Sequence, residues 1–369
     1  MSARVLALSL ATLLAVACGG PSGARPSAAP TTSPTFQKIV GAAATEGALS
    51  LQWTAGTQDN PDELRRQSDG FNKTYSLNVK VTFTPGPPVT DVIAKVIQAV
   101  QANKPSPTDV VIGDETQILA LAKANALESV LWTTWAPNIR DPRLTTPGGT
   151  AVQVQTRLPG LTYSTRLTGD AIPHSLADLL RPGLRGRVMS SPEGTVLEHL
   201  GSPELWGPGR TLDYVRQLSG QIGAFAGCGD EARLADGGLD VFAYDCGANH
   251  AAQLVKKGVP VGWAIPTDAA FVGYLYMGVP KTAPHPNTAK LWINYLLGRQ
   301  AQDVMFEFEA ADLHLLPGSH TFTDVDRYTK QGVKFFELTV EFAQVQENRG
   351  IRSIRPEIQS ILARAVSLR

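Results

Sequence analysis

Short apolar segments alternate with longer amphipathic segments through the first third of the chain. In the longer segments apolar side chains recur every three or four residues, which is typical of helices with one buried face. The expected strands are residues 48–53, 77–83 and 108–112, and the expected helices are residues 36–47, 60–75, 89–103 and 113–126. Because strands that alternate with helices favour a parallel sheet covered on both faces, the pattern predicts an α/β fold.

In sheets of this kind, ligands bind beyond the carboxyl ends of the strands. The first strand is followed by a polar turn, and the third by a pair of acids. The candidate ligand-binding residues at this edge are Thr54, Gly56, Thr57, Asp114 and Glu115. Asp114 has two interpretations, because its carboxylate suits a hard cation and aspartate is also a preferred residue at the start of a helix.

The pattern is irregular over residues 131–160, and a second set of strands follows it. A strand is expected at residues 186–190, and the loop after it contains Ser191, Glu193 and Thr195. A helix is expected to begin at this loop, where exposed backbone N–H groups suit an anionic ligand group. These three residues are therefore candidates for ligand binding from the second set of strands.

Later strands add aromatic, amide and acidic candidates. Tyr244 ends a strand at residues 239–244, and Asn249 lies shortly after it. Tyr244 suits either a ligand contact or a place in the core. Glu193 and Asp268 suit either recognition of a cationic group or a solvated turn. Four further aromatic residues suit pocket lining or core packing, namely Trp53, Tyr163, Trp263 and Phe271.

Two apolar runs, at residues 259–265 and 269–279, are separated by a break at residues 266–268. The polar turn after them leads to an amphipathic helix, for which Asn287 is the expected N-cap. Periodicity predicts three helices over residues 301–369. These helices are expected to pack on the rest of the chain without chemistry of their own.

The order of several motifs resembles that in extracellular solute-binding proteins of ABC importers, the group with ferric-ion, thiamine and phosphonate binders. The motifs are LTYST at residues 161–165, KKGVPV at residues 256–261 and APHPNTAK at residues 283–290. The resemblance implies the two-lobed periplasmic-binding-protein type 2 fold, with a mostly parallel, helix-flanked sheet in each lobe and two crossing strands as hinge. The implied parts are lobe 1 at 36–160 plus 266–310, lobe 2 at 161–265, and C-terminal helices at 311–369.

The same resemblance implies a receptor that captures a small solute between its lobes and delivers it to an ABC permease. The solute classes in view are an organic anion or phosphonate, a cation such as thiamine or a polyamine, and a metal ion held through Asp114. Ferric-binding members carry adjacent tyrosines after the strand that corresponds to residues 239–244. Here Tyr244 is the one tyrosine in that region, and Ala248 and Asn249 occupy the place of the pair, which argues against iron.

The N-terminus has the pattern of an export signal. Arg4 precedes an apolar stretch at residues 5–16, and small residues lead to Cys18. This predicts a signal peptide, and Cys18 resembles a lipobox cysteine that is acylated after export. The alternative is an ordinary signal peptide cut after Ala17. Residues 19–35 are rich in Gly, Ser, Pro, Ala and Thr, so they are expected to form a disordered tether to the membrane.

The composition of the chain limits which partners, disulfides and cofactors are expected. Lys plus Arg and Asp plus Glu both number 33, and this balance argues against a nucleic-acid partner. Cys228 and Cys246 are expected to form a disulfide in an exported protein, the alternative being two buried thiols. No zinc motif or cofactor motif is present, and a monomer is expected.

Two other classes of function compete with transport. One is a ligand-sensing lipoprotein that acts on a membrane signalling partner, and the other is an enzyme on the same fold. The sequence has no nucleophile elbow, phosphate loop or metal motif, so we expect a binding protein without catalytic residues.

Overall fold

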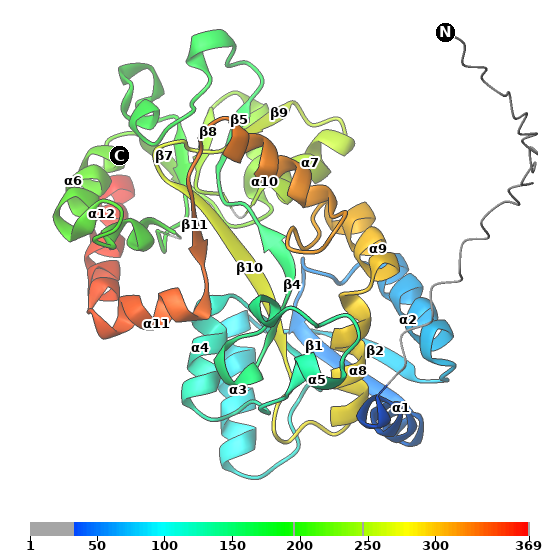
Figure 1. The fold of residues 1–369 in the computed structure, drawn as a ribbon. Helices are drawn as coiled ribbons and strands as arrows, with labels where there is room; N and C mark the ends of the chain where they lie inside the picture. The colour runs from blue at the N-terminus through cyan, green and yellow to red at the C-terminus, as the bar shows by residue number, and fades with distance from the viewer. Residues whose placement is uncertain (1–32, 195, 246, 368–369) are drawn as a thin grey trace, which may run out of the picture. The chain divides into compact units, whose positions relative to one another are not determined.

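The computed structural model describes residues 33–194, 196–245 and 247–367 (Figure 1). Cys18, Thr195 and Cys246 lie outside the described residues, as do the predicted signal peptide and most of the predicted tether. The strands of the described part form three β-sheets, of two, four and five strands. We call the elements around the two-stranded and four-stranded sheets lobe 1 and those around the five-stranded sheet lobe 2.

Lobe 1 is built on β1 (Ala48–Thr54), β2 (Lys80–Gly86), β3 (Val111–Gly113), β4 (Val152–Arg157) and β10 (Ala270–Gly278). β1 pairs in parallel with β2 and forms a parallel bridge from Leu51 to Val110, just before β3. β10 is antiparallel to both β3 and β4. The helices of this lobe are α1 (Pro34–Glu46), α2 (Pro61–Tyr75), α3 (Val89–Gln101), α4 (Glu115–Lys123), α5 (Trp132–Trp135), α8 (Pro286–Leu296) and α9 (Arg299–Glu309).

Lobe 2 contains a five-stranded sheet in the order β7-β6-β8-β5-β9. Its strands are β5 (Leu161–Ser164), β6 (Val188–Ser190), β7 (Ile222–Phe225), β8 (Val241–Ala243) and β9 (Val261–Ala264), and its helices are α6 (Gly207–Ser219) and α7 (Ala248–Lys256). β6 is parallel to β7 and β8, whereas β5 is antiparallel to β8 and β9. The described residues also form eight 3-10 helices, which lie across the two lobes and the C-terminal segment. They are η1 (Pro142–Leu144), η2 (Pro147–Gly149), η3 (Gly169–Ala171), η4 (Ala177–Leu180), η5 (Pro182–Leu184), η6 (Leu197–Gly201), η7 (Asp230–Asp236) and η8 (Ile351–Ile354).

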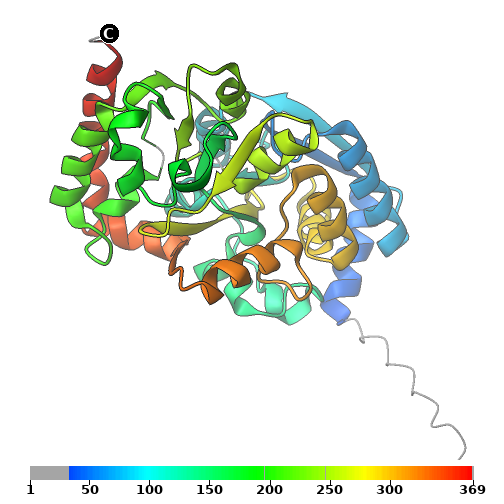
Figure 2. The ribbon, with the colours of Figure 1, turned by 90° about the horizontal axis from the view of Figure 1, so that it is seen from above.

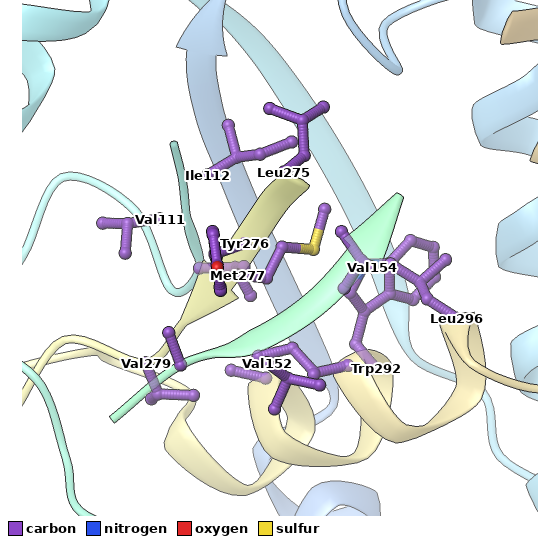
Figure 3. Packing of buried hydrophobic residues seen from close by; sticks show 14 of the residues in the cluster. Val111, Ile112, Val152, Val154, Leu275, Tyr276, Met277, Val279, Trp292 and Leu296 are labelled. Atoms are coloured by element: carbon purple, nitrogen blue, oxygen red, sulfur yellow. The ribbon is translucent and has the colours of Figure 1, made fainter. Parts of the chain in front are cut away.

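The chain crosses between the sheets twice, from β4 to β5 and from β9 to β10. Each lobe has its own hydrophobic core, and no buried residue belongs to both cores. β10 contributes Val272 and Tyr274 to the core of lobe 1 and Phe271 to the core of lobe 2. In lobe 1, side chains of β3, β4 and β10 pack against Trp292 and Leu296 of α8 (Figure 3). The crossings therefore join two separately packed units, which is the arrangement a hinge requires.

The starts of the first helices follow from local sequence. Ser33 accepts a hydrogen bond from the backbone N–H of Phe36, and Asn60 accepts two from the first turn of α2. α1 ends at Gly47, whose φ of 62° is left-handed. α1 begins at Pro34, so residues 34 and 35, which were predicted as the end of the tether, are helical, and the Ser33 cap explains this earlier start. The Asn60 cap accounts for the agreement of the start of α2 with the pattern of polar and apolar positions.

The expected N-cap of α8 is wrong. His285 is the N-cap, and Asn287 is already in the first turn. Glu46, at the end of α1, accepts hydrogen bonds from the backbone N–H groups of Asn287 (3.1 Å) and Thr288 (2.7 Å). A carboxylate from another helix therefore caps α8, which a local sequence pattern does not reveal.

The C-terminal segment departs from the three helices predicted for it. After α9 it contains α10 (His320–Lys330), β11 (Phe335–Leu338), α11 (Val340–Asn348) and α12 (Arg355–Ser367). β11 adds a parallel strand to β10. α11 packs on α4 of lobe 1 and α12 on α6 of lobe 2, as Figure 2 also shows for α12. This segment therefore contacts both lobes.

Two strands besides β11 were not predicted. β4 lies inside residues 131–160, where the pattern looks irregular, although Val152 and Val154 alternate there with Gln153 and Gln155. Both glutamines are buried, so the alternation of polarity does not mark an exposed face. β7 is the second unpredicted strand. Among the described helices, none is both long enough and apolar enough to cross a membrane.

Candidate functional site

A cavity of about 320 Å³ is lined by residues of both lobes and of the C-terminal segment. Lobe 1 contributes the end of β4, the start of α4 and Gly273 and Tyr274 of β10. Lobe 2 contributes the loop after β6, η6 and the residue after Tyr244. The lining residues are Thr90, Asp114, Glu115, Thr116, Gln117, Arg157, Pro159, Glu193, Val196, Glu198, His199, Cys228, Asp245, Gly273, Tyr274, Leu338 and Arg355. Its size suits a small metabolite.

Asp114 is the N-cap of α4 and lines this cavity. Its Oδ1 accepts hydrogen bonds from the backbone N–H groups of Thr116 (2.9 Å) and Gln117 (3.0 Å) and from the hydroxyl of Thr116. The side chain of Gln117 accepts in return from the N–H of Asp114, which completes a capping box. The capping role therefore holds, and it occupies only one of the two carboxylate oxygens.

Glu115 faces a histidine from the other lobe. Its Oε1 lies 3.5 Å from Nε2 of His199, and both side chains are buried. Burial, followed by the charge of Asp114, raises the pKa of Glu115 well above its ordinary value. Burial lowers the pKa of His199, so it disfavours the charged form of each partner. The Nδ1 of His199 is 2.8 Å from Oε1 of Gln346 in α11.

Glu198 is 1% exposed and is held by arginines of the C-terminal segment. Arg355 donates two hydrogen bonds to it, one of them 2.5 Å long from Nε to Oε2. Nη2 of Arg352 lies 3.7 Å from Oε1 of Glu198. Burial works against the charge of Arg355, but the bonds to Glu198 outweigh it and raise the pKa of Arg355. Glu198 is thus compensated within the protein.

Asp245 is fully buried at the edge of the cavity. Its Oδ1 accepts hydrogen bonds of 3.0 Å from the backbone N–H groups of Gly160 and Gly247, and Thr162 donates to its Oδ2. Burial raises the pKa of Asp245 despite these bonds. Because Gly160 lies in the first crossing, Asp245 ties that crossing to the end of β8.

Arg157 is the last residue of β4, directly before the first crossing. Its Nε is buried and has no hydrogen-bond partner among the described residues. Burial lowers the pKa of Arg157, and the charges of Asp114, Glu309 and Glu115 oppose that shift. The guanidinium remains charged at neutral pH because its ordinary pKa is so high.

Three of the residues predicted for ligand binding line the cavity, namely Asp114, Glu115 and Glu193. The turn after β1 is not part of it. There the hydroxyl of Thr54 donates to the carbonyl of Pro87, the N–H of Gly56 donates to Asp59, and the carbonyl of Thr57 accepts from Trp53. These contacts form a closed turn at the end of the first strand.

Four more predicted residues lie outside the described lining of the cavity. Ser191 and Asn249 are buried. Tyr244 is also buried, and its hydroxyl donates a 2.6 Å hydrogen bond to the carbonyl of Ala269. Asp268 accepts from the backbone N–H of Leu176 at 2.8 Å, so it has a structural partner in lobe 2.

The aromatic candidates also lie away from this cavity. Trp53 and Phe271 are buried in the cores of lobe 1 and lobe 2. Trp263 lines a separate hollow beside α7, and Tyr163 is partly buried on β5. Tyr274, which was not among these candidates, lines the cavity between the lobes. Its hydroxyl donates to Glu337 at 3.1 Å.

Cys228 lines the cavity and is disulfide-bonded. Its expected partner, Cys246, lies outside the described residues, so the pairing of these two cysteines stays a prediction. Within residues 33–194, 196–245 and 247–367, no group of three or more His, Cys, Asp or Glu side chains is arranged to hold a metal ion.

Several lining residues were not predicted from the sequence, above all Arg157, Glu198, His199 and Arg355. Arg157 ends a strand that was not predicted, although its place just before LTYST at residues 161–165 marks it as a residue of the crossing. Arg355 comes from the C-terminal segment, which was expected to have no chemistry of its own. No local pattern in the sequence indicates that this segment reaches the cavity.

A family model described as bacterial extracellular solute-binding protein matches residues 67–334 of the chain. The search of curated protein sequences gave no significant match. Many solved structures are similar to this one.

The periplasmic binding protein AfuA from Actinobacillus pleuropneumoniae, with fructose-6-phosphate bound, is 20% identical with a TM-score of 0.64, over 85% of this chain and 99% of that one. IdiA (FutA) from Trichodesmium, in complex with iron and citrate, is 15% identical with a TM-score of 0.61, over 86% and 99%. The substrate-binding protein of an ABC transporter from Agrobacterium tumefaciens is 14% identical with a TM-score of 0.67, over 85% and 94%. At these identities the likeness concerns the fold, and it confirms the predicted two-lobed periplasmic-binding-protein type 2 architecture.

Proposed function

The chain belongs to the bacterial extracellular solute-binding protein family, which serves ABC transporters, and we propose that the cavity between its lobes is where it captures its solute. The single observation that carries this proposal is the composition of the cavity wall. Residues of β4, α4, η6 and the loop after β6 line one space of about 320 Å³. A ligand in that space touches both lobes at once.

The proposed mechanism is closure of the lobes about the two crossings. A ligand that binds both lobes stabilises the closed arrangement by the difference between its affinities for the closed and open arrangements. The pair Glu115–His199 brings the lobes together directly, at 3.5 Å. The ABC permease would then receive the solute from the closed form.

We place the protein outside the cytoplasm, anchored by lipid at Cys18 through a tether that ends before α1. The support is the apolar segment at residues 5–16 and the small residues before Cys18. Incorporation of label into the protein in cells fed radioactive palmitate tests the anchor separately from solute binding. The label is expected in wild type and is expected to be lost in Cys18→Ser.

The solute is a small metabolite or ion, drawn from organic anions, phosphonates, thiamine-like cations and metals. The absent tyrosine pair weighs against iron, since Tyr244 points its hydroxyl at the carbonyl of Ala269. The proposal assigns no catalytic residue.

Native mass spectrometry of the chain without residues 1–32 tests solute capture. The expected result is a discrete added mass that is lost on unfolding and that exchanges when solutes are added to refolded protein. A bare mass, together with no thermal shift from any solute class above, would contradict the proposal.

A further inference from the structure

We propose that the captured solute carries an oxyanion group (a phosphate, phosphonate or carboxylate) and that Arg157 binds it. This inference rests on the proposed function and narrows it to one class of solute. It depends on which charges in the cavity already have partners and which do not.

Arg157 stands where a solute that bridges the lobes would lie. It ends β4, lines the cavity and pairs across the sheet with Gly273 of β10. A Cβ placed on Gly273 would lie 3.7 Å from Cδ1 of Leu338 and 3.9 Å from Cβ of Arg157, both ordinary contact distances. Gly273, Leu338 and Arg157 all line the cavity.

The buried Nε of Arg157 lacks a hydrogen-bond partner among the described residues. A buried polar group on a charged side chain is costly when it is left unpaired. Guanidinium groups match the paired oxygens of phosphates and carboxylates. The missing partner is therefore supplied most simply by an anionic group of the solute.

The acids around the cavity do not fill this role. Glu198 is held by Arg355 at 2.5 Å and faces Arg352 at 3.7 Å. Asp245 accepts from Gly160, Gly247 and Thr162.

The two acids of α4 are also engaged. Glu115 is buried against His199. Asp114 uses Oδ1 to cap α4. Glu309, whose charge also acts on Arg157, accepts from the N–H of Gln58 at 2.9 Å. Among the described residues no ion pair joins Arg157 to these acids, so its positive charge is left for a ligand.

A second feature of the cavity also favours an anion. α3 has 13 residues, and its N-cap is Pro88, which makes no side-chain capping hydrogen bond. Thr90, in the first turn of α3, lines the same cavity as Arg157. The positive end of the α3 dipole thus adds to the charge of Arg157 at one cavity.

The rest of the solute is expected to be polar. Asp114 keeps Oδ2 outside its capping bonds, and Glu193, on the loop after β6, lines the cavity with an exposed side chain. Both accept hydrogen bonds from hydroxyl or amino groups. The chemistry indicated is therefore a small oxyanion with several hydrogen-bond donors, rather than a fatty acid or a purely cationic amine.

Calorimetric titration of the chain without residues 1–32 tests the inference with defined probes. The oxyanion probes are glucose 6-phosphate, 2-aminoethylphosphonate and citrate, and the cationic probes are thiamine and spermidine. At least one oxyanion probe is expected to bind, and the phosphate, phosphonate and carboxylate arms separate the three sources of the shared chemistry. The solute found by native mass spectrometry, if any is retained, is titrated in the same way.

The variants Arg157→Met and Arg157→Lys are then compared with wild type. Loss of a charge-assisted pair is expected to weaken oxyanion binding about 10- to 100-fold in Arg157→Met. Arg157→Lys is expected to retain part of the affinity because it keeps the charge. Arg185→Met, which removes an exposed arginine of lobe 2, is the matched control and should bind as wild type. Thermal melting of each variant shows that it is folded, and Arg157→Lys carries the test if Arg157→Met is not.

Two results would overturn the inference. Tight binding of a cationic probe, with an affinity that Arg157→Met leaves unchanged, would refute the oxyanion while leaving solute capture in place. Binding of no probe by a protein that also retains no solute would contradict the proposed function and the inference together.

Discussion

Glu115 of lobe 1 and His199 of lobe 2 meet with Oε1 and Nε2 3.5 Å apart, both side chains being almost fully buried. Phe271 and Phe342 pack around the imidazole, with ring centroids 6.0 and 5.8 Å from it. Burial among these rings lowers the pKa of His199, so it disfavours protonation of the imidazole between the lobes.

The pH dependence of stability tests this account of His199. Its pKa is lowered from 6.5 on folding, so the unfolded chain binds more protons as the pH falls through 6.5. The contribution of the neutral imidazole to stability is thus present above that pH and is lost below it. The melting temperature of wild type minus that of His199→Gln should shrink between pH 7.5 and pH 5.5. A difference that stays constant over this range would contradict a neutral buried imidazole.

Arg355→Met should destabilise the protein by leaving Glu198 buried without its main partner. We expect a loss of about 2–4 kcal/mol, at the lower side of the range for broken buried pairs, because Arg352 remains nearby. Urea denaturation measures it. The double variant Glu198→Gln/Arg355→Met should recover most of the loss.

The control for this pair is Arg349→Met. Arg349 also forms an ion pair between α11's end and lobe 2, with Glu204 at 2.5 Å, but both side chains are about half exposed. Its removal should cost less than about 1 kcal/mol. Equal losses in Arg349→Met and Arg355→Met would show that burial of Glu198 is not the cause.

Glu63 and Glu309 form a buried carboxyl pair between α2 and α9. Burial, followed by the charge of Glu309, raises the pKa of Glu63 to about 9. The folded protein therefore retains a proton that the unfolded chain loses above pH 4.5, and the stability from this group declines as the pH rises from 4.5 toward 9. Glu63→Gln should gain in melting temperature relative to wild type between pH 5 and pH 8. Glu307→Gln, on the exposed face of α9, should show no such gain.

Glu46 joins the end of α1 to the start of α8 through four hydrogen bonds to Asn287 and Thr288. Burial alone would raise its pKa, but these bonds outweigh burial and lower it. Its contribution is therefore present above pH 4.5 and is lost as the pH falls below that value. Glu46→Ala should cost about 1–2 kcal/mol near pH 7, as a lost helix cap does, and less near pH 3. An unchanged urea midpoint at pH 7 would contradict the capping role.

The sequence predicts the elements whose signals are local. The Asn60 cap, the apolar runs of β1 and β10, and Asp114 after β3 all lie within a few residues of what they determine. The same holds for the α/β fold, which follows from the alternation of strands and helices. The motif order adds the two-lobed arrangement, because each crossing has its own short motif.

What the sequence does not predict depends on contacts between distant segments. Glu46 caps a helix 241 positions away, and Arg355 reaches Glu198 across 157 positions. β4 is missed because Gln153 and Gln155 are buried, which reverses the usual meaning of alternating polarity. Arg157 is missed with β4. The polar wall of the cavity is thus assembled by tertiary contacts that no local pattern records.

A crystal structure of the chain with its retained or titrated solute tests the central claim most directly. The account predicts one solute in the cavity between the lobes, in contact with residues of both, and with an anionic group on the guanidinium of Arg157. A solute bound outside this cavity, or held by one lobe only, would contradict the claim that capture occurs between the lobes.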